Sequence, residues 1–227
     1  MSVHLQKELD QLERQLLSLS AFVQENIQKA VRAFEDRDLN LAQQVIEADA
    51  EIDSMEVDIE EECLKMLALY QPVAVDLRFI VAALKINNDL ERVGDLAKNI
   101  AKRVEILAEN PQVQIPFDFK PIGDYTLELL RKTLDSFVKL DIKQAYEIRK
   151  MDKRIDEEHH KAEDAVSQAI QANPKNDRCL LQTLWVSRSL ERVGDHATNI
   201  AEDIIYILEG EIVRHSAKEK MIEDQQQ

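Results

Sequence analysis

A twelve-residue stretch that occurs twice constrains the fold of this chain more than any other feature. It reads LERVGDLAKNIA at residues 90–101 and LERVGDHATNIA at residues 190–201, with ten identical positions. Only two positions differ, and the pairs are Leu96 with His196 and Lys98 with Thr198. Because the apolar residues recur at steps of three and four, the repeat predicts one amphipathic helix present in two copies.

The polar residues of the repeat recur as well, at a spacing of four that places each set on one helical face. The two sets are Glu91, Asp95 and Asn99, and Glu191, Asp195 and Asn199. A hydrophobic core would require only the apolar positions to recur. The repeated carboxylates therefore indicate a task that both halves of the chain share.

The surrounding sequence predicts three helices in each half. Only four glycines and five prolines interrupt the 227 residues, whereas a sheet protein needs many turn residues. Three amphipathic helices can bury their apolar stripes only against one another, so we expect an all-α protein of two tandem three-helix bundles. The expected segments are a first bundle at residues 1–110, a proline-rich linker at 111–123, a second bundle at 124–210 and a polar tail at 211–227.

A second correspondence, at a shift of 103 residues, relates the helices that precede the repeats. Asp38 and Asp141 are equivalent, and each is expected to cap the following helix by accepting a backbone N–H. An acidic row follows each cap, and the corresponding pairs are Asp49 with Asp152, Asp53 with Asp156, Glu56 with His159 and Glu60 with Glu163. Each member of the row is kept or replaced by another residue that can ligate a metal.

If consecutive helices lie antiparallel, the two acidic rows of each half face each other across a groove. Four carboxylates so close repel one another unless a cation or protons intervene. Oxygen ligands suit divalent or trivalent ions of iron, zinc, manganese or magnesium, and histidine adds a nitrogen ligand. The predicted metal ligands are Asp49, Asp53, Glu91, Asp95 and Asn99 in the first half, and Asp152, Asp156, His159, Glu191, Asp195 and Asn199 in the second, with His196 as a further candidate.

The same rows are also typical of solvated helix faces in an acidic protein, and the sequence leaves both interpretations open. Arg92 and Arg192 recur with the carboxylates and would pair with acids of the neighbouring row in a structural use. Gly94 and Gly194 lie inside predicted helices, where glycine costs about 1 kcal/mol relative to alanine. A close approach between helices explains them better than access to a ligand.

Composition and motifs weigh against several other functions. The net charge of −15 disfavours nucleic-acid binding. No apolar run is long enough to span a membrane, and the N-terminal stretch lacks the pattern of a signal peptide. Cys63 and Cys179 are far apart and are expected to be reduced, buried thiols of a cytosolic protein.

A carboxylate-bridged metal enzyme or a metal store is the alternative function. Ferritin-like centres of this class take a Glu-x-x-His motif from each of two helices. This chain has one such motif, Glu157 to His160, in the second half only. No local pattern assembles a nucleophile, base and acid either, so we expect a protein that is not an enzyme.

On these residues the chain resembles the PhoU family of phosphate-specific transport system accessory proteins. The resemblance covers residues 5–208, and it rests on NNDLERVGDLAKNIA (87–101), SRSLERVGDHATNIAEDI (187–204), EADAEID (47–53) and KMDKRID (150–156). It implies a tandem pair of three-helix bundles and, in some members, multinuclear metal clusters on the acidic rows.

The resemblance also implies a function that spacing and composition do not reach. It implies a non-enzymatic cytoplasmic regulator, held at the inner membrane through protein partners without inserting into it. Such a protein represses the phosphate-starvation response and phosphate uptake when phosphate is plentiful. The implied partners are the ATPase subunit of the phosphate ABC transporter, a sensor histidine kinase and a second copy of the chain in a homodimer.

Overall fold

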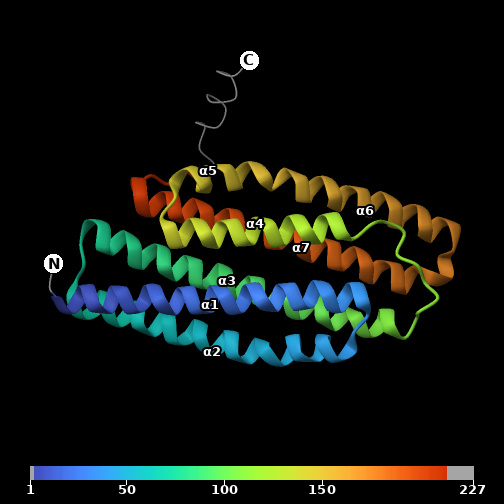
Figure 1. Cartoon of the computed structure of the whole chain (residues 1–227), viewed down its shortest axis with the longest axis horizontal. Coiled ribbons are helices and arrows are strands. Elements are labelled where there is room, and N and C mark those ends of the chain that lie inside the picture. Colours follow the sequence, from blue (N-terminus) through green and yellow to red (C-terminus); the bar gives the residue numbers. More distant parts are fainter. Residues whose placement is uncertain (1–2, 214–227) are drawn as a thin grey trace, which may run out of the picture.

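The computed structural model describes residues 3–213, which fold into helices without any strand in that range (Figure 1). In chain order the elements are α1 (Val3–Asp36), α2 (Leu39–Tyr70), α3 (Ala74–Ala108), α4 (Lys120–Lys139), α5 (Ile142–Met151), α6 (Lys153–Ala172), the short 3-10 helix η1 (Pro174–Asn176) and α7 (Asp177–Glu209). The predicted all-α class is confirmed. Most of the polar tail expected at 211–227 lies outside the described residues.

The helices form two three-helix bundles, as predicted. Helices α1, α2 and α3 make the first, and α4, α5 with α6, and α7 make the second; α3 and α7 pack side by side where the bundles meet (Figure 1). These two helices run antiparallel, because Lys85 of α3 pairs with Asp203 near the end of α7, while Arg103 bonds to Gln182 near its start. Buried apolar residues of both bundles belong to one continuous core.

Aspartate caps begin the second helix of each half. Oδ1 of Asp38 accepts the backbone N–H groups of Asn40 and Leu41 at 2.9 and 3.0 Å. Oδ1 of Asp141 accepts the N–H of Gln144 at 3.1 Å. Such a cap satisfies a backbone donor that has no partner within the helix and contributes about 1 kcal/mol. Both capping predictions are confirmed.

Hydrogen bonds from Arg37 hold the start of the linker against the first bundle. Its guanidinium donates to three backbone carbonyl oxygens at the end of α3 and just beyond it, those of Leu107, Asn110 and Val113, at 3.2, 3.2 and 2.7 Å. The carbonyl oxygens of Leu107 and Asn110 also accept backbone N–H groups, from Asn110 and Val113 at 3.2 and 3.1 Å, so the guanidinium adds a further donor to each. The segment between α3 and α4 spans residues 109–119, and α4 therefore starts inside the stretch expected as linker.

The helix expected after Asp141 is divided in two, with Asp152 between α5 and α6. The carbonyl oxygen of Asp152 accepts the N–H of Ile155 at 2.8 Å and that of Asp156 at 3.3 Å, which tightens the first turn of α6. In the first bundle α2 continues unbroken past the corresponding Asp49. One predicted metal ligand of the second half thus lies at a break in its helix.

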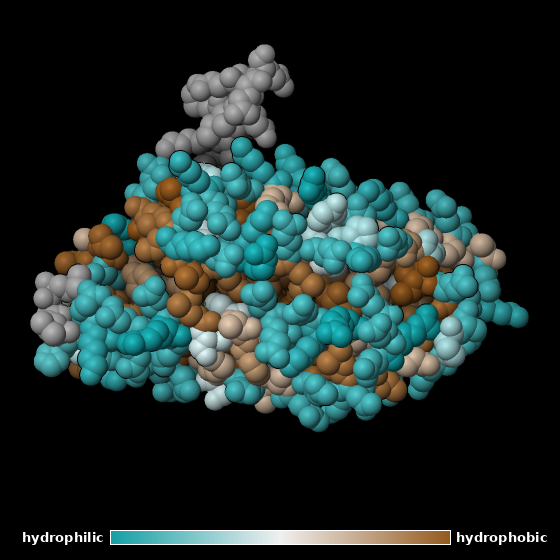
Figure 2. All heavy atoms as spheres, in the orientation of Figure 1, coloured by the Kyte–Doolittle hydropathy of each residue, from teal (hydrophilic) through white to brown (hydrophobic). Residues whose placement is uncertain are grey.

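Polar residues cover most of the outer surface. Figure 2 shows them over much of one face, with apolar residues gathered along the seam between the two bundles. Among residues 3–213, no helix combines the length and the hydropathy needed to cross a membrane. Cys63 and Cys179 are buried free thiols, as expected.

Candidate metal-binding clusters

The first bundle brings its two acidic rows together between α2 and α3. Burial is the main cause that raises the pKa of Glu91, and the charges of Asp95 and Asp53 add to it against the opposing charge of Arg92. Asp49, the fourth carboxylate, is only 3% exposed. We call Asp49, Asp53, Glu91 and Asp95 the first cluster.

A lysine that the sequence interpretation did not single out enters the first cluster. Nζ of Lys98 donates a hydrogen bond to Oδ2 of Asp49 and forms an ion pair with it. This bond is the main cause that raises the pKa of Lys98, so the ammonium stays charged. The only signal in the sequence was that Lys98 is one of the two positions where the repeats differ.

The second bundle brings together the corresponding carboxylates Asp152, Asp156, Glu191 and Asp195, which we call the second cluster. Burial, followed by the charges of Asp156, Asp195 and Glu191, raises the pKa of Asp152 to about 7. Burial is also the main cause that raises the pKa of Glu191 and of Asp195. Protonation or a cation would relieve this repulsion, because either reduces the density of negative charge.

Three buried oxygen atoms on these helices have no hydrogen-bond partner in the described part of the chain, and they are Oδ1 of Asp152, Oε2 of Glu191 and Oγ1 of Thr198. Gly194 makes room for the first of them, since a Cβ there would lie 2.6 Å from Oδ1 of Asp152. At Gly94 the near neighbour of such a Cβ is Cδ1 of Ile52, at 2.9 Å. A Cβ at Gly194 would also lie 3.0 Å from Cδ1 of Ile155, so close helix packing explains both glycines, and Gly194 accommodates a carboxylate in addition.

Arg92 and Arg188 pair with carboxylates of their own helices. Arg92 lies 3.4 Å from Glu91 and 3.5 Å from Asp95, so the pairing expected with the neighbouring row is not what the structure shows. In the second half the pairing arginine is Arg188, which precedes the repeat, and its Nη1 donates to Oε1 of Glu191 at 2.7 Å. These side chains are half exposed, and ion pairs of this kind contribute little to stability.

His159 is buried beside α7 and has partners other than the clustered carboxylates. Its Nδ1 lies 2.9 Å from Oγ of Ser187, and its Nε2 lies 3.5 Å from Oε1 of Glu163. Burial lowers the pKa of His159, which favours the neutral ring. Both ring nitrogens of His159 therefore contact residues outside the second cluster.

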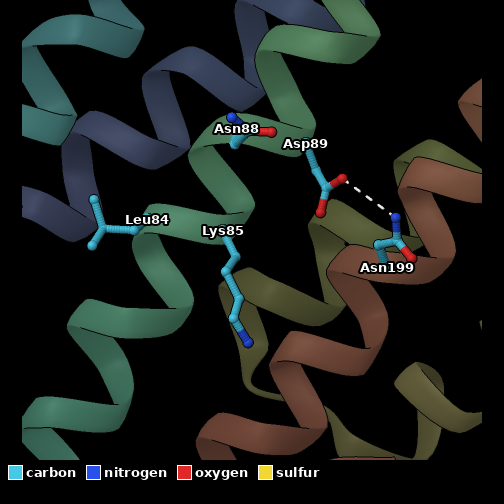
Figure 3. A pocket seen from close by; sticks show the side chains of 5 residues that line it. All are labelled: Leu84, Lys85, Asn88, Asp89 and Asn199. Atoms are coloured by element: carbon cyan, nitrogen blue, oxygen red, sulfur yellow. Dashed lines mark hydrogen bonds between the residues drawn. The ribbon is translucent and has the colours of Figure 1, made fainter. Parts of the chain in front are cut away.

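Asn199 and His196 face the other bundle. Nδ2 of Asn199 donates to Oδ1 of Asp89 on α3 at 3.4 Å (Figure 3), and Nδ1 of His196 lies 2.8 Å from the same oxygen. Asn199 and Asp89 line a pocket between the bundles together with Leu84, Lys85 and Asn88. The structure thus places these two predicted ligands in the contact between bundles, and it leaves Asn99 exposed.

The donor chemistry of the second cluster fits a hard or borderline cation, because its buried oxygen atoms lack partners. Across residues 3–213, however, no three Asp, Glu, His or Cys side chains converge closely enough to surround one ion. A complete ligand set requires the exposed Asp195 to turn inward, or water to supply the remaining ligands. In the first cluster Nζ of Lys98 donates to Oδ2 of the buried Asp49, and Oδ1 of Asp49 has no partner among the described residues, like the three oxygen atoms of the second half.

The single Glu-x-x-His motif does not contribute to either cluster. Glu157 and His160 are both exposed on α6, and His160 pairs with Glu163 at 3.0 Å. A ferritin-like centre needs such motifs turned inward from two helices. The alternative of a carboxylate-bridged metal enzyme therefore gains no support from this motif.

The fold and the clusters define a class of all-helical protein in which two homologous three-helix bundles each carry a carboxylate cluster between their last two helices. Comparison with known proteins agrees with this description. The PhoU domain matches residues 16–104 and again residues 119–204. The chain belongs to the PhoU family.

The similarity to known proteins covers nearly the whole chain. A phosphate-specific transport system accessory protein PhoU homolog of Aquifex aeolicus is 40% identical over 94% of this chain and 97% of that protein. The accessory protein PhoU of Escherichia coli K12 is 31% identical over 92% of this chain and 86% of its own length. The crystal structure of PhoU from Pseudomonas aeruginosa superimposes with a TM-score of 0.87, at 37% identity, over 91% of this chain and 99% of that one.

Proposed function

We propose that this chain is a non-enzymatic accessory and regulatory protein of a phosphate transport system. The observation that carries the proposal is that both halves match the PhoU domain. Relatives described as phosphate-specific transport system accessory proteins match it over nearly its full length. Two repeats in one body suit an adaptor, because each bundle offers its own outer surface to a partner.

In this proposal the protein acts in the cytoplasm, as a homodimer, at the inner face of the membrane. It couples the ATPase subunit of the phosphate ABC transporter to a sensor histidine kinase. Through that coupling it represses the phosphate-starvation response and phosphate uptake when phosphate is plentiful. The resemblance to the PhoU family supports these partners, and the acidic surface supports contact with a basic patch on one of them.

The proposal includes cation binding at the carboxylate clusters. Asp152, Asp156, Glu191 and Asp195 would hold a divalent ion of iron, zinc, manganese or magnesium. A bound ion there supplies positive charge between α6 and α7. Asp156 belongs to α6, and Glu191 and Asp195 belong to α7, so we expect a bound ion to change how these two helices pack.

Recruitment to membranes tests the proposed coupling. Membranes from cells with and without the phosphate transporter are mixed with the purified chain and sedimented. A net charge of −15 opposes adsorption to anionic lipid, so we expect sedimentation only with transporter-containing membranes. Added salt should weaken this contact if an acidic surface meets a basic one. Equal sedimentation with both membranes would reject recruitment through the transporter.

A further inference from the structure

An exposed stripe of arginine and apolar side chains runs along the first half of α7. Its members recur at steps of three and four, so they share one helical face. They are Arg178, Leu181, Trp185, Arg188 and Arg192, and all five are exposed. Every charged member is an arginine, although the net charge of the chain is −15. We call these five residues the α7 stripe.

The first bundle holds the aromatic ring of this stripe in place. The guanidinium carbon of Arg103 on α3 lies 5.8 Å from the centre of the Trp185 ring, and Nη1 of Arg103 donates to Oε1 of Gln182 at 2.8 Å. The cation–π contact orients the ring, yet Trp185 stays 55% exposed. Tryptophan and arginine contribute most to binding at protein interfaces, and an oriented side chain loses little entropy on binding.

The outer face of α2 has the opposite charge and apolar side chains of its own. Every charged residue between positions 39 and 64 is an acid. Val57 and Leu64 are each about half exposed, and the exposed Glu60 and Glu61 lie between them. Seven residues of helix separate Val57 from Leu64 by about 10 Å, which leaves room for one large ring. We call these four residues the α2 stripe.

The two stripes cannot meet within one chain. Helix α2 packs against α1 and α3, and across residues 3–213 it makes no contact with α7, which belongs to the other bundle (Figure 1). Both stripes therefore remain open on the surface of a single copy. Opposite charges and exposed apolar side chains make them complementary, so a contact between two copies would cover both.

We propose that a second copy of this chain covers the α7 stripe with its α2 stripe. Trp185 of one copy seats between Val57 and Leu64 of the other, and the arginines on either side meet Glu60 and Glu61. This inference rests on the homodimer of the proposed function and adds the surfaces that form it. The contact joins unlike surfaces, so a dimer closes when each copy supplies α7 to one contact and α2 to the other.

Reversing the charge of each stripe in turn tests this pairing. One variant carries Arg178→Glu with Arg192→Glu, and the other carries Glu60→Arg with Glu61→Arg. The full chain is checked for helical content, and its association is followed by sedimentation from the micromolar to the millimolar range. Trp185 is the only tryptophan of the chain, so its fluorescence reports whether the stripe is covered.

The wild type should associate, and its tryptophan emission should shift to shorter wavelengths as the ring leaves water. Added salt should oppose both changes. Each charge-reversed variant alone should raise the dissociation constant about tenfold or more, because like charges then face each other. An equimolar mixture of the two variants should associate as the wild type does, because every contact between unlike variants again joins opposite charges.

The matched control carries Lys139→Glu with Lys143→Glu, which changes two exposed lysines of the second bundle by the same charge. It should associate as the wild type does. Trp185→Ala should raise the dissociation constant about tenfold or more by sedimentation. If the variant with two new glutamates in α7 does not fold, Trp185→Ala and the variant with two new arginines in α2 decide the matter.

Three results would overturn the proposal. The first is a wild type that stays monomeric across this range, which would leave the α7 stripe to a different protein. The second is association that the charge reversals do not weaken, which would keep the homodimer but reject these surfaces. The third is a mixture of the two variants that does not associate. Membrane recruitment is a separate measurement, so its failure would reject the coupling and leave this contact standing.

Discussion

Gly194 lies directly against the carboxylate of Asp152, so closely that a Cβ at this position would stand 2.6 Å from Oδ1. The contact joins the break between α5 and α6 to the repeated segment of α7. Both glycines also lie against an isoleucine, since a Cβ at Gly194 would stand 3.0 Å from Cδ1 of Ile155 and one at Gly94 would stand 2.9 Å from Cδ1 of Ile52. Both therefore allow close helix packing, and Gly194 in addition makes room for a carboxylate.

Alanine substitutions at the two glycines separate the effect on helix packing from the effect on the carboxylate. Alanine would normally stabilise a helix by about 1 kcal/mol relative to glycine. Overpacking costs about 1–3 kcal/mol, so Gly94→Ala and Gly194→Ala should both reduce or cancel that gain in urea denaturation. Only Gly194→Ala should weaken Mn²⁺ binding, because only there does the methyl group displace a carboxylate. Equal Mn²⁺ affinity in both variants would contradict this account.

The second cluster should make the metal-free protein less stable as the pH rises. The pKa of Asp152 is about 7 in the folded protein, against an ordinary value of 3.8. Between these values the folded state keeps a proton that the unfolded state has lost. The free energy of unfolding therefore falls as the pH rises through this window, and the loss is complete above the folded pKa.

Urea denaturation of chelator-treated protein at about pH 5 and about pH 8 measures this dependence. Asp152→Asn removes the titrating group that faces Asp156, Glu191 and Asp195, so the difference between the two conditions should shrink. Asp164→Asn, which changes an exposed acid of α6, is the control. A pH dependence that is unchanged in Asp152→Asn would show that the acidic cluster is not its source.

The bond between His196 and Asp89 should hold the two bundles together. His196→Leu inserts the residue of the first repeat and leaves the carboxylate of Asp89 buried with a weaker partner, at a cost of about 1–3 kcal/mol. Asp89→Ser inserts the residue found at position 189. Combining the two substitutions removes the carboxylate that His196→Leu leaves with only the weaker partner Asn199. The double variant should therefore lose less stability than the sum of the two single losses. Additive losses in calorimetric unfolding would argue against a direct interaction.

The sequence was sufficient to predict the architecture because the apolar periodicity survives duplication. Stripes such as Leu90, Val93, Ala97 and Ile100 are fully buried, and the second repeat buries its counterparts. The acidic rows lie on neighbouring helices for the same reason, since residues beside a buried stripe lie near the contact between two packed helices. Asp38 and Asp141 were predictable as caps because capping depends on local chemistry.

The finer arrangement of the clusters depended on contacts that no local pattern contains. A lysine side chain is long enough to reach several neighbours, so its spacing alone did not assign Lys98 to Asp49. His196 and Asn199 face the first bundle because α3 packs against α7. This packing joins segments far apart in the sequence, so no local pattern predicts it. The break at Asp152 likewise follows a stretch whose helical pattern continues through it.

Regulation of the phosphate-starvation response is the central claim, and a starvation-promoter reporter in phosphate-rich medium tests it most directly. The strains compared are the wild type, a deletion of the gene for this chain, and the deletion restored with the intact gene. The account predicts that the reporter is silent in the wild type, strongly expressed in the deletion strain and silent again on restoration. A reporter that remains silent in the deletion strain would contradict the regulatory role.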